Sequence, residues 1–325
     1  MKKVQVLLVM LLLAVALPSL AKSPELKFRN DNFKIIQFTD IHWNSDHKYK
    51  IYNDSTEMMM RQVIEAEKPD LVIITGDISV SKGAKEGWDQ VTRPMTDLKV
   101  PFAVTFGNHD TESDMPKLEA LKYLQSNPFN LTQDSGEEVD GVGNSTLAVK
   151  SSESDKDSWL IYLFDSHAYT NDSIMGHYDW IKKSQIDWYV DQSNKFTEKN
   201  SEVVPALAFF HIPLPEYEYV RNQKSTLGNH SEEVCSPQIN SGLFWAFLQQ
   251  KDVMATFVGH DHNDDFIGSL ANIHLAYGRK SGYVTAYKEI LERGARVIEL
   301  HEKEKEVRTY IRTMSGTSLE YSFKK

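Results

Sequence analysis

The chain has 325 residues, of which 41% are hydrophobic and 25% are charged, and its formal net charge is −10. These values are ordinary for a globular protein, so they exclude extended disorder and allow one large domain or two smaller ones. An acidic chain lacks the broad basic surface of nucleic-acid binders, so we expect no nucleic-acid polymer as a partner.

The first residues are typical of a secretory signal. Two lysines precede an apolar stretch from Val4 to Leu17, and a small-residue cleavage pattern follows. A membrane anchor is the alternative, but this stretch is shorter than the roughly 20 residues of a spanning helix. We therefore predict a signal peptide over residues 1–21 and one domain over residues 22–325. The mature protein would be exported, periplasmic or secreted, without stable membrane insertion.

Apolar, β-branched runs alternate with stretches of helical character along the chain, which predicts an α/β domain with a buried sheet. The expected strands are residues 33–38, 71–75, 102–106, 146–150, 159–164, 206–210 and 254–258. The expected helices are residues 55–68, 116–125, 185–199 and 241–250. Residues 295–300 and 307–312 alternate like antiparallel strands, and we expect them to form a sheet edge of the same domain.

Five of these runs end in side chains that can bind metal ions. They are Asp40 and His42 after run 33–38, Asp77 after 71–75, Asn108, His109 and Asp110 after 102–106, His211 after 206–210, and His260 and His262 after 254–258. A lone Asp or His after a strand is usually a turn former or a structural residue. Five such strand ends predict a site, because ligands gather beyond the carboxyl ends of strands in open α/β sheets.

The residue types fit a pair of metal ions. Two ions roughly 3.5–4 Å apart can clamp a phosphoryl group, and a carboxylate between them offsets their repulsion. Asp77, which follows Gly76, is the candidate for this bridge. A mixture of imidazole, carboxylate and amide ligands suits Zn, Mn or Fe better than Ca or Mg alone. Asn108 would add a neutral oxygen, which limits the negative charge facing an anionic substrate.

The blocks DxH, GD, GNHD, a separate His and GHxH resemble those of the calcineurin-like metallophosphoesterases, over about residues 33–301. The stretches RQVIEAEKPDLVIITGDI and FFHIPLPEY are similar to the single-domain, purple-acid-phosphatase-like subgroup. The resemblance implies a four-layer αββα sandwich of two mixed sheets and two divalent transition-metal ions. It implies one ion between Asp40, His42, Asp77 and His262, and another between Asp77, Asn108, His211 and His260.

The resemblance also implies an exported phosphatase that cleaves phosphate monoesters by attack of a metal-activated water. His109 would donate a proton to the leaving group, and Asp110 would orient His109. A phosphodiesterase or nucleotide hydrolase with the same site is the first alternative. A non-catalytic phosphate- or metal-binding protein is the second, which is weakened because every expected ligand is present. The physiological ester and the oligomeric state are not indicated.

One block departs from the purple acid phosphatases proper, which have GDxxY. Here the block reads GDISV, so Val80 stands where the coloured enzymes carry tyrosine, and we expect a colourless protein. Four residues near the motifs could touch the substrate, although a solvated surface role is the expectation: Glu216, Tyr217, Arg279 and Lys280. Four histidines are expected not to be ligands: His167, His177, His230 and His274.

Overall fold

The computed structural model describes residues 24–172, 174–284 and 290–325, so the predicted signal peptide lies outside the described residues. Within these ranges the strands form two six-stranded sheets. The first has the order β12-β11-β10-β1-β2-β3, in which β2 and β3 run parallel to β1 while β10 to β12 are antiparallel neighbours. Its strands are β1 (Asn32–Phe38), β2 (Leu71–Thr75), β3 (Phe102–Thr105), β10 (Gly294–His301), β11 (Glu306–Thr313) and β12 (Gly316–Lys324).

The second sheet has the order β4-β5-β6-β7-β9-β8. The strands β5, β6, β7 and β9 are parallel, and β4 and β8 are antiparallel edges. The bounds are β4 (Ser145–Lys150), β5 (Asp157–Leu163), β6 (Ala206–Phe209), β7 (Val253–Val258), β8 (Ile267–Leu270) and β9 (Ile273–Tyr277). Both sheets are therefore mixed, as predicted.

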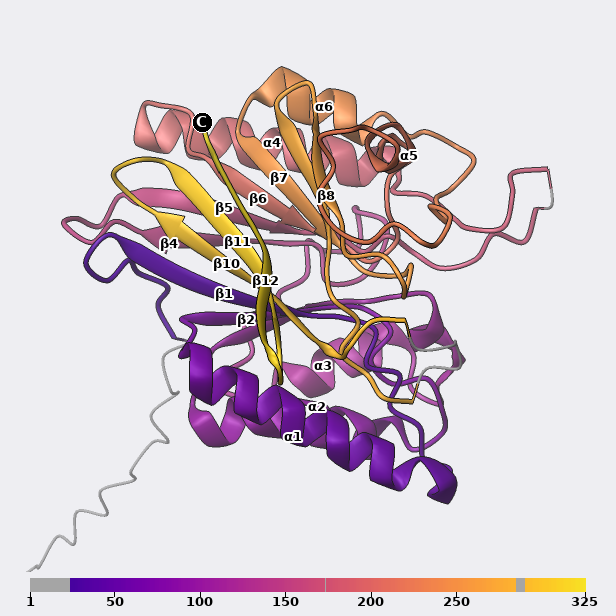
Figure 1. Cartoon of the computed structure of the whole chain (residues 1–325). Helices are drawn as coiled ribbons and strands as arrows, with labels where there is room; N and C mark the ends of the chain where they lie inside the picture. Colours follow the sequence, from indigo (N-terminus) through magenta and orange to yellow (C-terminus); the bar gives the residue numbers. More distant parts are fainter. Residues whose placement is uncertain (1–23, 173, 285–289) are drawn as a thin grey trace, which may run out of the picture.

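Helices cover the outer face of each sheet (Figure 1). One side carries α1 (Lys50–Glu67), α2 (Ala84–Leu98) and α3 (Lys117–Leu124), and the other carries α4 (Lys183–Asn200), α5 (Glu216–Arg221) and α6 (Leu243–Gln250). The result is a four-layer αββα sandwich, which confirms the predicted fold.

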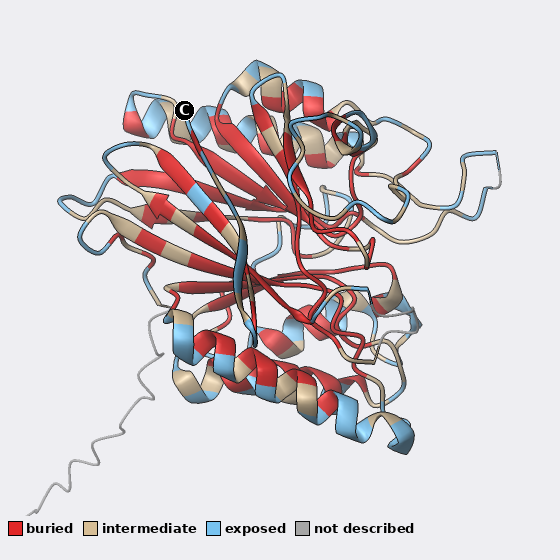
Figure 2. Ribbon diagram, viewed as in Figure 1, coloured by how far each residue is buried: buried red, intermediate tan, exposed pale blue. Residues whose placement is uncertain are grey.

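The strand β1 shows why the predicted runs carry apolar residues at both odd and even positions. Phe33 and Ile35 pack between the two sheets, whereas Ile36 and Phe38 pack against the layer of α1 to α3. Successive side chains of a strand point to opposite faces, so a strand covered on both faces needs apolar residues at odd and even positions. Figure 2 shows this burial in the central strands, with the exposed residues on the outer faces of the helices.

A buried polar residue joins the two sheets beside the predicted site. The side-chain amide of Gln37 in β1 donates to the Thr75 hydroxyl at 2.9 Å and to the Val258 carbonyl at 3.0 Å. These two partners are the last residues of β2 and β7. The hydrogen bonds therefore hold the carboxyl edges of the two sheets together.

Several elements were not predicted, namely α2, α5, β8, β9 and β12.

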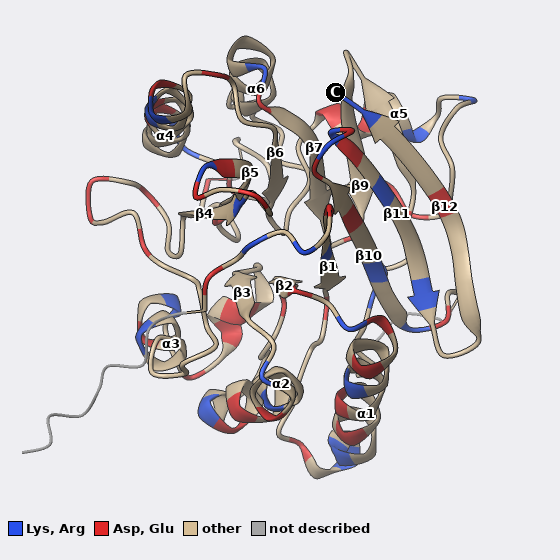
Figure 3. Ribbon diagram, turned by 90° about the vertical axis from the view of Figure 1, so that its left-hand side faces the viewer, with Lys and Arg blue, Asp and Glu red and all other residues tan. Residues whose placement is uncertain are grey.

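Figure 3 shows Lys and Arg interspersed with Asp and Glu along α1, α2 and α4. Among the described residues, the helices are all too short or too polar to cross a bilayer.

Candidate metal centre

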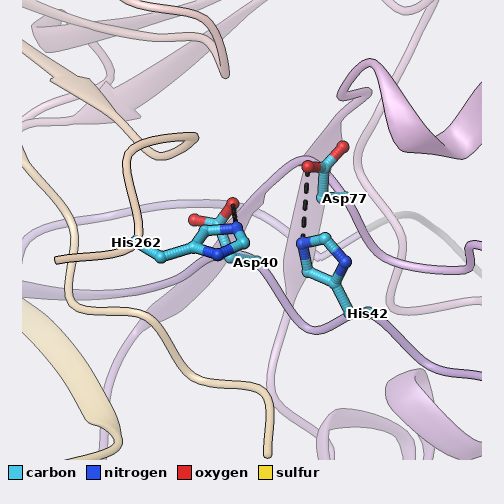
Figure 4. Close-up of side chains that lie close together, drawn as sticks. All are labelled: Asp40, His42, Asp77 and His262. Atoms are coloured by element: carbon cyan, nitrogen blue, oxygen red, sulfur yellow. Dashed lines mark ion pairs between the residues drawn. The ribbon is translucent and has the colours of Figure 1, made fainter. Parts of the chain in front are cut away.

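The carboxyl ends of β1, β2, β6 and β7 bring the predicted ligands into two groups. One contains Asp40, His42, Asp77 and His262, and the other contains Asp77, His211 and His260. Within each group the ligand atoms lie within 4.8 Å of one another. Figure 4 shows the first group, in which side chains from three separate loops point toward one another. The structure thus brings together residues that are up to 222 positions apart, from 40 to 262.

Asp77 belongs to both groups. Its Oδ2 atom lies 3.1 Å from Nε2 of His211 and 3.5 Å from Nε2 of His42. Its Oδ1 atom accepts the backbone N–H of His109 at 2.8 Å. This contact brings the loop of Asn108 beside the second group. The position of Asp77 is the one that a carboxylate shared by two ions requires.

Four of the predicted ligands have left-handed backbone conformations. The φ angles are 53° at Asp40, 54° at His42, 51° at Asp77 and 81° at His260. Such conformations are uncommon outside glycine, although Asp and His adopt them more often than most residues. Each costs on the order of 1–3 kcal/mol when the residue is strained, and such residues cluster at functional sites. The chain turns sharply here, directly after each strand, so that the side chains face one another.

Two glycines make room for the ligands. A Cβ atom at Gly107 would overlap the carboxylate and backbone of Asp77, and one at Gly259 would overlap Thr39 and the carboxylate of Asp40. Neither position can hold a larger residue without displacing a predicted ligand. The glycines in GNHD and GHDH therefore do more than permit a turn.

Unsatisfied ligand atoms test whether the site fits metal ions. Within the described part of the chain, four buried atoms here have no hydrogen-bond partner: His42 Nε2, Asn108 Oδ1, His211 Nε2 and His260 Nε2. Buried polar atoms are nearly always satisfied, because leaving one unpaired costs about 1–3 kcal/mol. A cluster of unpaired nitrogen and oxygen atoms beside two carboxylates is a donor set that can coordinate metal ions. The residues therefore fit a dinuclear metal site.

The second contact of His211 selects its ligand atom. Nδ1 of His211 lies 2.7 Å from the Thr75 carbonyl oxygen, which can only accept a hydrogen bond. Nδ1 is therefore the donor, and Nε2 is the nitrogen that faces Asp77. Fixing one imidazole nitrogen in this way is the usual means of orienting a metal-binding histidine.

The electrostatics of the pocket place most ligands in their metal-binding forms. Burial lowers the pKa of His42 to about 3 and that of His260 to about 3, so both rings are neutral near pH 7. Burial alone would raise the pKa of Asp77, but His211 holds it well below the usual range. Burial alone would likewise lower the pKa of His211, but Asp77 raises it to about 9. A proton therefore has to leave His211 when an ion binds.

The geometry agrees with the comparison to known families. The sequence profile of the family described as calcineurin-like phosphoesterase matches residues 33–264. The chain is a member of this family. The match spans the whole set of predicted ligands and confirms the family resemblance.

Named relatives of this calcineurin-like phosphoesterase include plant and yeast proteins. It is 33% identical over 321 residues to the Arabidopsis thaliana protein named "Probable inactive purple acid phosphatase 29", covering 89% of this chain and 82% of that one. It is 31% identical over 264 residues to "Phosphatase DCR2" of Saccharomyces cerevisiae, covering 72% of this chain and 44% of that protein. These similarities confirm the predicted likeness to purple-acid-phosphatase-like proteins.

Two solved structures share the fold. A dimetal phosphatase from Danio rerio superposes with a TM-score of 0.62 at 11% identity, covering 90% of this chain and 98% of that one. A purple acid phosphatase from yellow lupin seeds gives a TM-score of 0.57 at 15% identity, covering 90% and 54%. At such low identities these likenesses support the fold alone.

The phosphoesterase has His109 beside the candidate ligand His42, and its imidazole has a partner other than the predicted Asp110. His109 lies in a short 3-10 helix (His109–Glu112), and its ring centroid is 5.3 Å from that of His42. Its Nδ1 atom is 2.7 Å from Glu112 Oε1. The sequence motif predicts this orienting contact for Asp110, whereas in the structure Glu112 makes it.

Asp110 instead joins two ligand loops. Its Oδ1 atom accepts the backbone N–H groups of Ile78 and Ser79 at 2.8 and 3.0 Å, and Oδ2 accepts that of Gly107 at 2.8 Å. Burial, together with the charge of Asp77, raises the pKa of Asp110 to about 6. The carboxylate holds the loop after β2 against the loop after β3, so it positions the ligands rather than the proton donor.

The peripheral candidates lie elsewhere than expected. Tyr217 is fully buried, and its hydroxyl lies 2.7 Å from the Thr256 hydroxyl, so it belongs to the core and is not solvated. Arg279 and Lys280 are buried rather than solvated, and Arg279 pairs with Asp265. Glu216 accepts a hydrogen bond from the side chain of Asn240 at 2.7 Å. Neither ligand group of the described residues includes the four histidines expected not to bind metal: His167, His177, His230 and His274.

Proposed function

We propose that this protein hydrolyses phosphate monoesters at a site containing two divalent transition-metal ions, with Mn, Zn and Fe as the candidates. The observation that carries the proposal is the pair of ligand groups joined by Asp77, with buried imidazole and amide atoms unsatisfied beside it. When bound, two such ions supply positive charge for the phosphate oxygens and an activated water as nucleophile.

The residues of the chain divide the remaining work. Asp40, His42, Asp77 and His262 would hold one ion, and Asp77, Asn108, His211 and His260 would hold the other. His109 sits at the rim of the site, with its side chain 35% exposed, where a leaving alcohol can reach it. Because Glu112 occupies Nδ1 of His109, the ring presents Nε2 to the substrate and can protonate the leaving oxygen from there. General acid catalysis of this kind contributes typically 10²–10⁴-fold.

Turnover is favoured over simple binding. Some relatives carry the word "inactive" in their names. This chain keeps the ligand groups and His109, which supports catalysis. The name of another relative, a yeast phosphatase, supports phosphatase activity. The signal pattern of residues 1–21 supports export, and the interspersed surface charges support a small phosphate ester rather than a nucleic-acid polymer as the partner.

The test compares p-nitrophenyl phosphate with bis-p-nitrophenyl phosphate in the presence of Mn, Zn or Fe. We expect metal-dependent release of p-nitrophenol that is faster from the monoester and is abolished by a chelator. Asp77→Asn serves as the matched control for contaminating phosphatases. Faster cleavage of the diester would replace the proposal with a phosphodiesterase, and no metal-dependent cleavage of either ester would leave a binding protein.

A further inference from the structure

A tyrosine outside the sequence motifs connects the predicted metal ligand Asn108 with Glu112, the partner of His109. Building on the proposed function, we infer that Tyr169 is a positioning residue that orients the amide of Asn108 toward its ion and steadies Glu112 against His109. Tyr169 lies in the connection between β5 and α4, far from every family motif in the sequence.

The hydroxyl group of Tyr169 accepts one hydrogen bond and donates another. The side-chain N–H of Asn108 donates to it at 2.8 Å, and the hydroxyl donates to Oε1 of Glu112 at 3.5 Å. The same Oε1 atom is 2.7 Å from Nδ1 of His109. A carboxylate can only accept hydrogen bonds, so both the tyrosine hydroxyl and His109 Nδ1 are donors to Glu112. The contact with Glu112 at 3.5 Å is long, so the hydrogen bond with Asn108 is the stronger of the two.

This directionality decides which way the Asn108 amide faces. The tyrosine hydroxyl has one proton, which Glu112 takes, so it can offer only a lone pair to Asn108. The amide nitrogen of Asn108 therefore faces Tyr169, and its oxygen faces the opposite way. That oxygen, Oδ1, is one of the buried atoms without a hydrogen-bond partner in the described part of the chain. Oδ1 is the only atom of the Asn108 side chain that can bind an ion, and the hydrogen bond to Tyr169 keeps it turned away from the tyrosine and free to do so.

The backbone around Tyr169 is a short two-stranded ribbon. The N–H of Thr170 donates to the His177 carbonyl at 3.0 Å, and the N–H of Asp179 donates to the Ala168 carbonyl at 3.0 Å. Tyr169 lies between these two hydrogen bonds. Its position is therefore set by backbone pairing and does not depend on the ions.

Ring contacts fix the side chain as well. The ring of Tyr169 stacks on that of Tyr178 with centroids 5.9 Å apart and an interplanar angle of 28°. The ring of Tyr178 in turn meets His260 edge-on, with centroids 4.6 Å apart. The ribbon therefore lies beside two predicted ligands of the same ion, Asn108 and His260. Partners that orient ligands in this way typically contribute 10–100-fold to metal affinity.

The decisive variant is Tyr169→Phe in the full chain, which removes one oxygen atom and keeps the stacked ring. Each protein is freed of metal and titrated with Zn or Mn against a chromogenic chelator, which yields the affinities of the two ions separately. We expect one ion to bind 10–100-fold more weakly and the other to bind as in the wild type. The metal-free variant should melt at the wild-type temperature, and Tyr219→Phe, the same change at a tyrosine that is 70% exposed, should change neither affinity.

Wild-type affinity for both ions in Tyr169→Phe would overturn the inference. Equal weakening of both ions with a lower melting temperature would also overturn it, because that pattern means a merely structural role. The contact of Tyr169 with Glu112 is tested in Tyr169→Phe by the ratio of turnover on an alkyl phosphate to turnover on p-nitrophenyl phosphate. We expect this ratio to fall, because the alkyl ester depends more on His109; an unchanged ratio refutes the contact with Glu112. If the wild type cleaves neither ester, the proposed function fails, while the affinities still decide the role of Tyr169.

Discussion

The Oδ2 atom of Asp77 lies 3.1 Å from Nε2 of His211. Both atoms are buried, and this nitrogen has no hydrogen-bond partner in the described part of the chain. The same carboxylate oxygen also faces His42 in the other ligand group. One side chain therefore couples the two halves of the centre, whereas each histidine serves a single half.

The first prediction concerns metal content. Asp77→Asn removes the negative charge shared by both groups, so we expect it to lose both ions, whereas His211→Ala should lose one and keep the other. Elemental analysis after dialysis measures the number of ions per chain. Two ions retained in Asp77→Asn would show that the carboxylate is not shared.

The second prediction separates metal binding from proton donation. His109→Ala leaves the ligand side chains in place, so it should bind two ions like the wild type. Its turnover on alkyl phosphates should fall by about 10²–10⁴-fold, with a smaller fall on p-nitrophenyl phosphate, whose leaving group needs little protonation. Steady-state kinetics on the two esters measures the difference. An equal fall on both esters would contradict the role of proton donor.

The third prediction tests Asp110 as a structural link. In Asp110→Asn the amide nitrogen would meet a backbone N–H where a carboxylate oxygen now accepts one, which leaves at least one buried donor unpaired. The free energy of unfolding should fall by about 1–3 kcal/mol in urea titrations. Asp114→Asn is the matched control, because Asp114 accepts the N–H groups of Gly83 and Ala84 from an exposed position. Equal losses of unfolding free energy in the two variants would argue against Asp110 as the link between the two loops.

The fourth prediction is spectroscopic. Val80 follows Asp77 at the position where the coloured phosphatases carry tyrosine. We expect iron-loaded protein to show no strong visible charge-transfer band, because no tyrosinate is among the ligands. An absorption spectrum with such a band would mean that a tyrosine binds the iron. Loss of the band in Tyr169→Phe would then identify Tyr169, which lies beside Asn108, as that ligand.

The fifth prediction is a pH effect outside the metal site. Burial lowers the pKa of His274 to about 4, and its ring stacks on Phe323 with centroids 3.8 Å apart. An unfolded chain protonates this ring near pH 6.5 and the folded one near pH 4. The contribution of His274 is thus neutral above pH 6.5 and destabilising as the pH falls toward 4. Urea titrations at pH 7.5 and 4.5 should show that His274→Phe loses less stability than the wild type over this range; an equal loss would mean that His274 stays accessible to protons.

Much of the site was predictable because each ligand block is local. The predicted ligands follow their strands within two to four positions, and the strands themselves are marked by mostly apolar runs. The convergence of Asp40 with His262 then follows from a general property of α/β sheets. Sequence and structure agree here because the same short segments carry both the strand signal and the ligand.

Some elements escaped prediction for local reasons. Pro94 lies inside α2, where a proline normally ends a helix, but burial of Trp88, Val91 and Met95 on the same helix outweighs this preference. The hairpin of β8 and β9 turns at Ala271 and Asn272, both with positive φ. Such a turn is usually marked by Asn-Gly, so the pair Ala-Asn gave no signal.

The orienting contacts could not be found from spacing alone. Tyr169 is 61 positions from Asn108, and nothing in its surroundings resembles a motif. Glu112, by contrast, is three residues after His109, and its contact depends on the short 3-10 helix that brings positions i and i+3 together. The prediction of a surface role for Tyr217 was wrong because a tyrosine beside a proline-rich segment is compatible with either a surface or a core position.

The central place of β1 governs when the protein can fold during synthesis. β1 is made first, yet it lies between β2 and β10, and it pairs with β10 from Asn32 opposite His301 to Gln37 opposite Arg296. A nascent chain that has not yet reached Gly294 therefore presents β1 with one edge of unpaired backbone N–H and C=O groups. Such edges are templates for aggregation. We therefore expect a nonsense mutation before β10 to yield an aggregating product rather than a smaller folded protein.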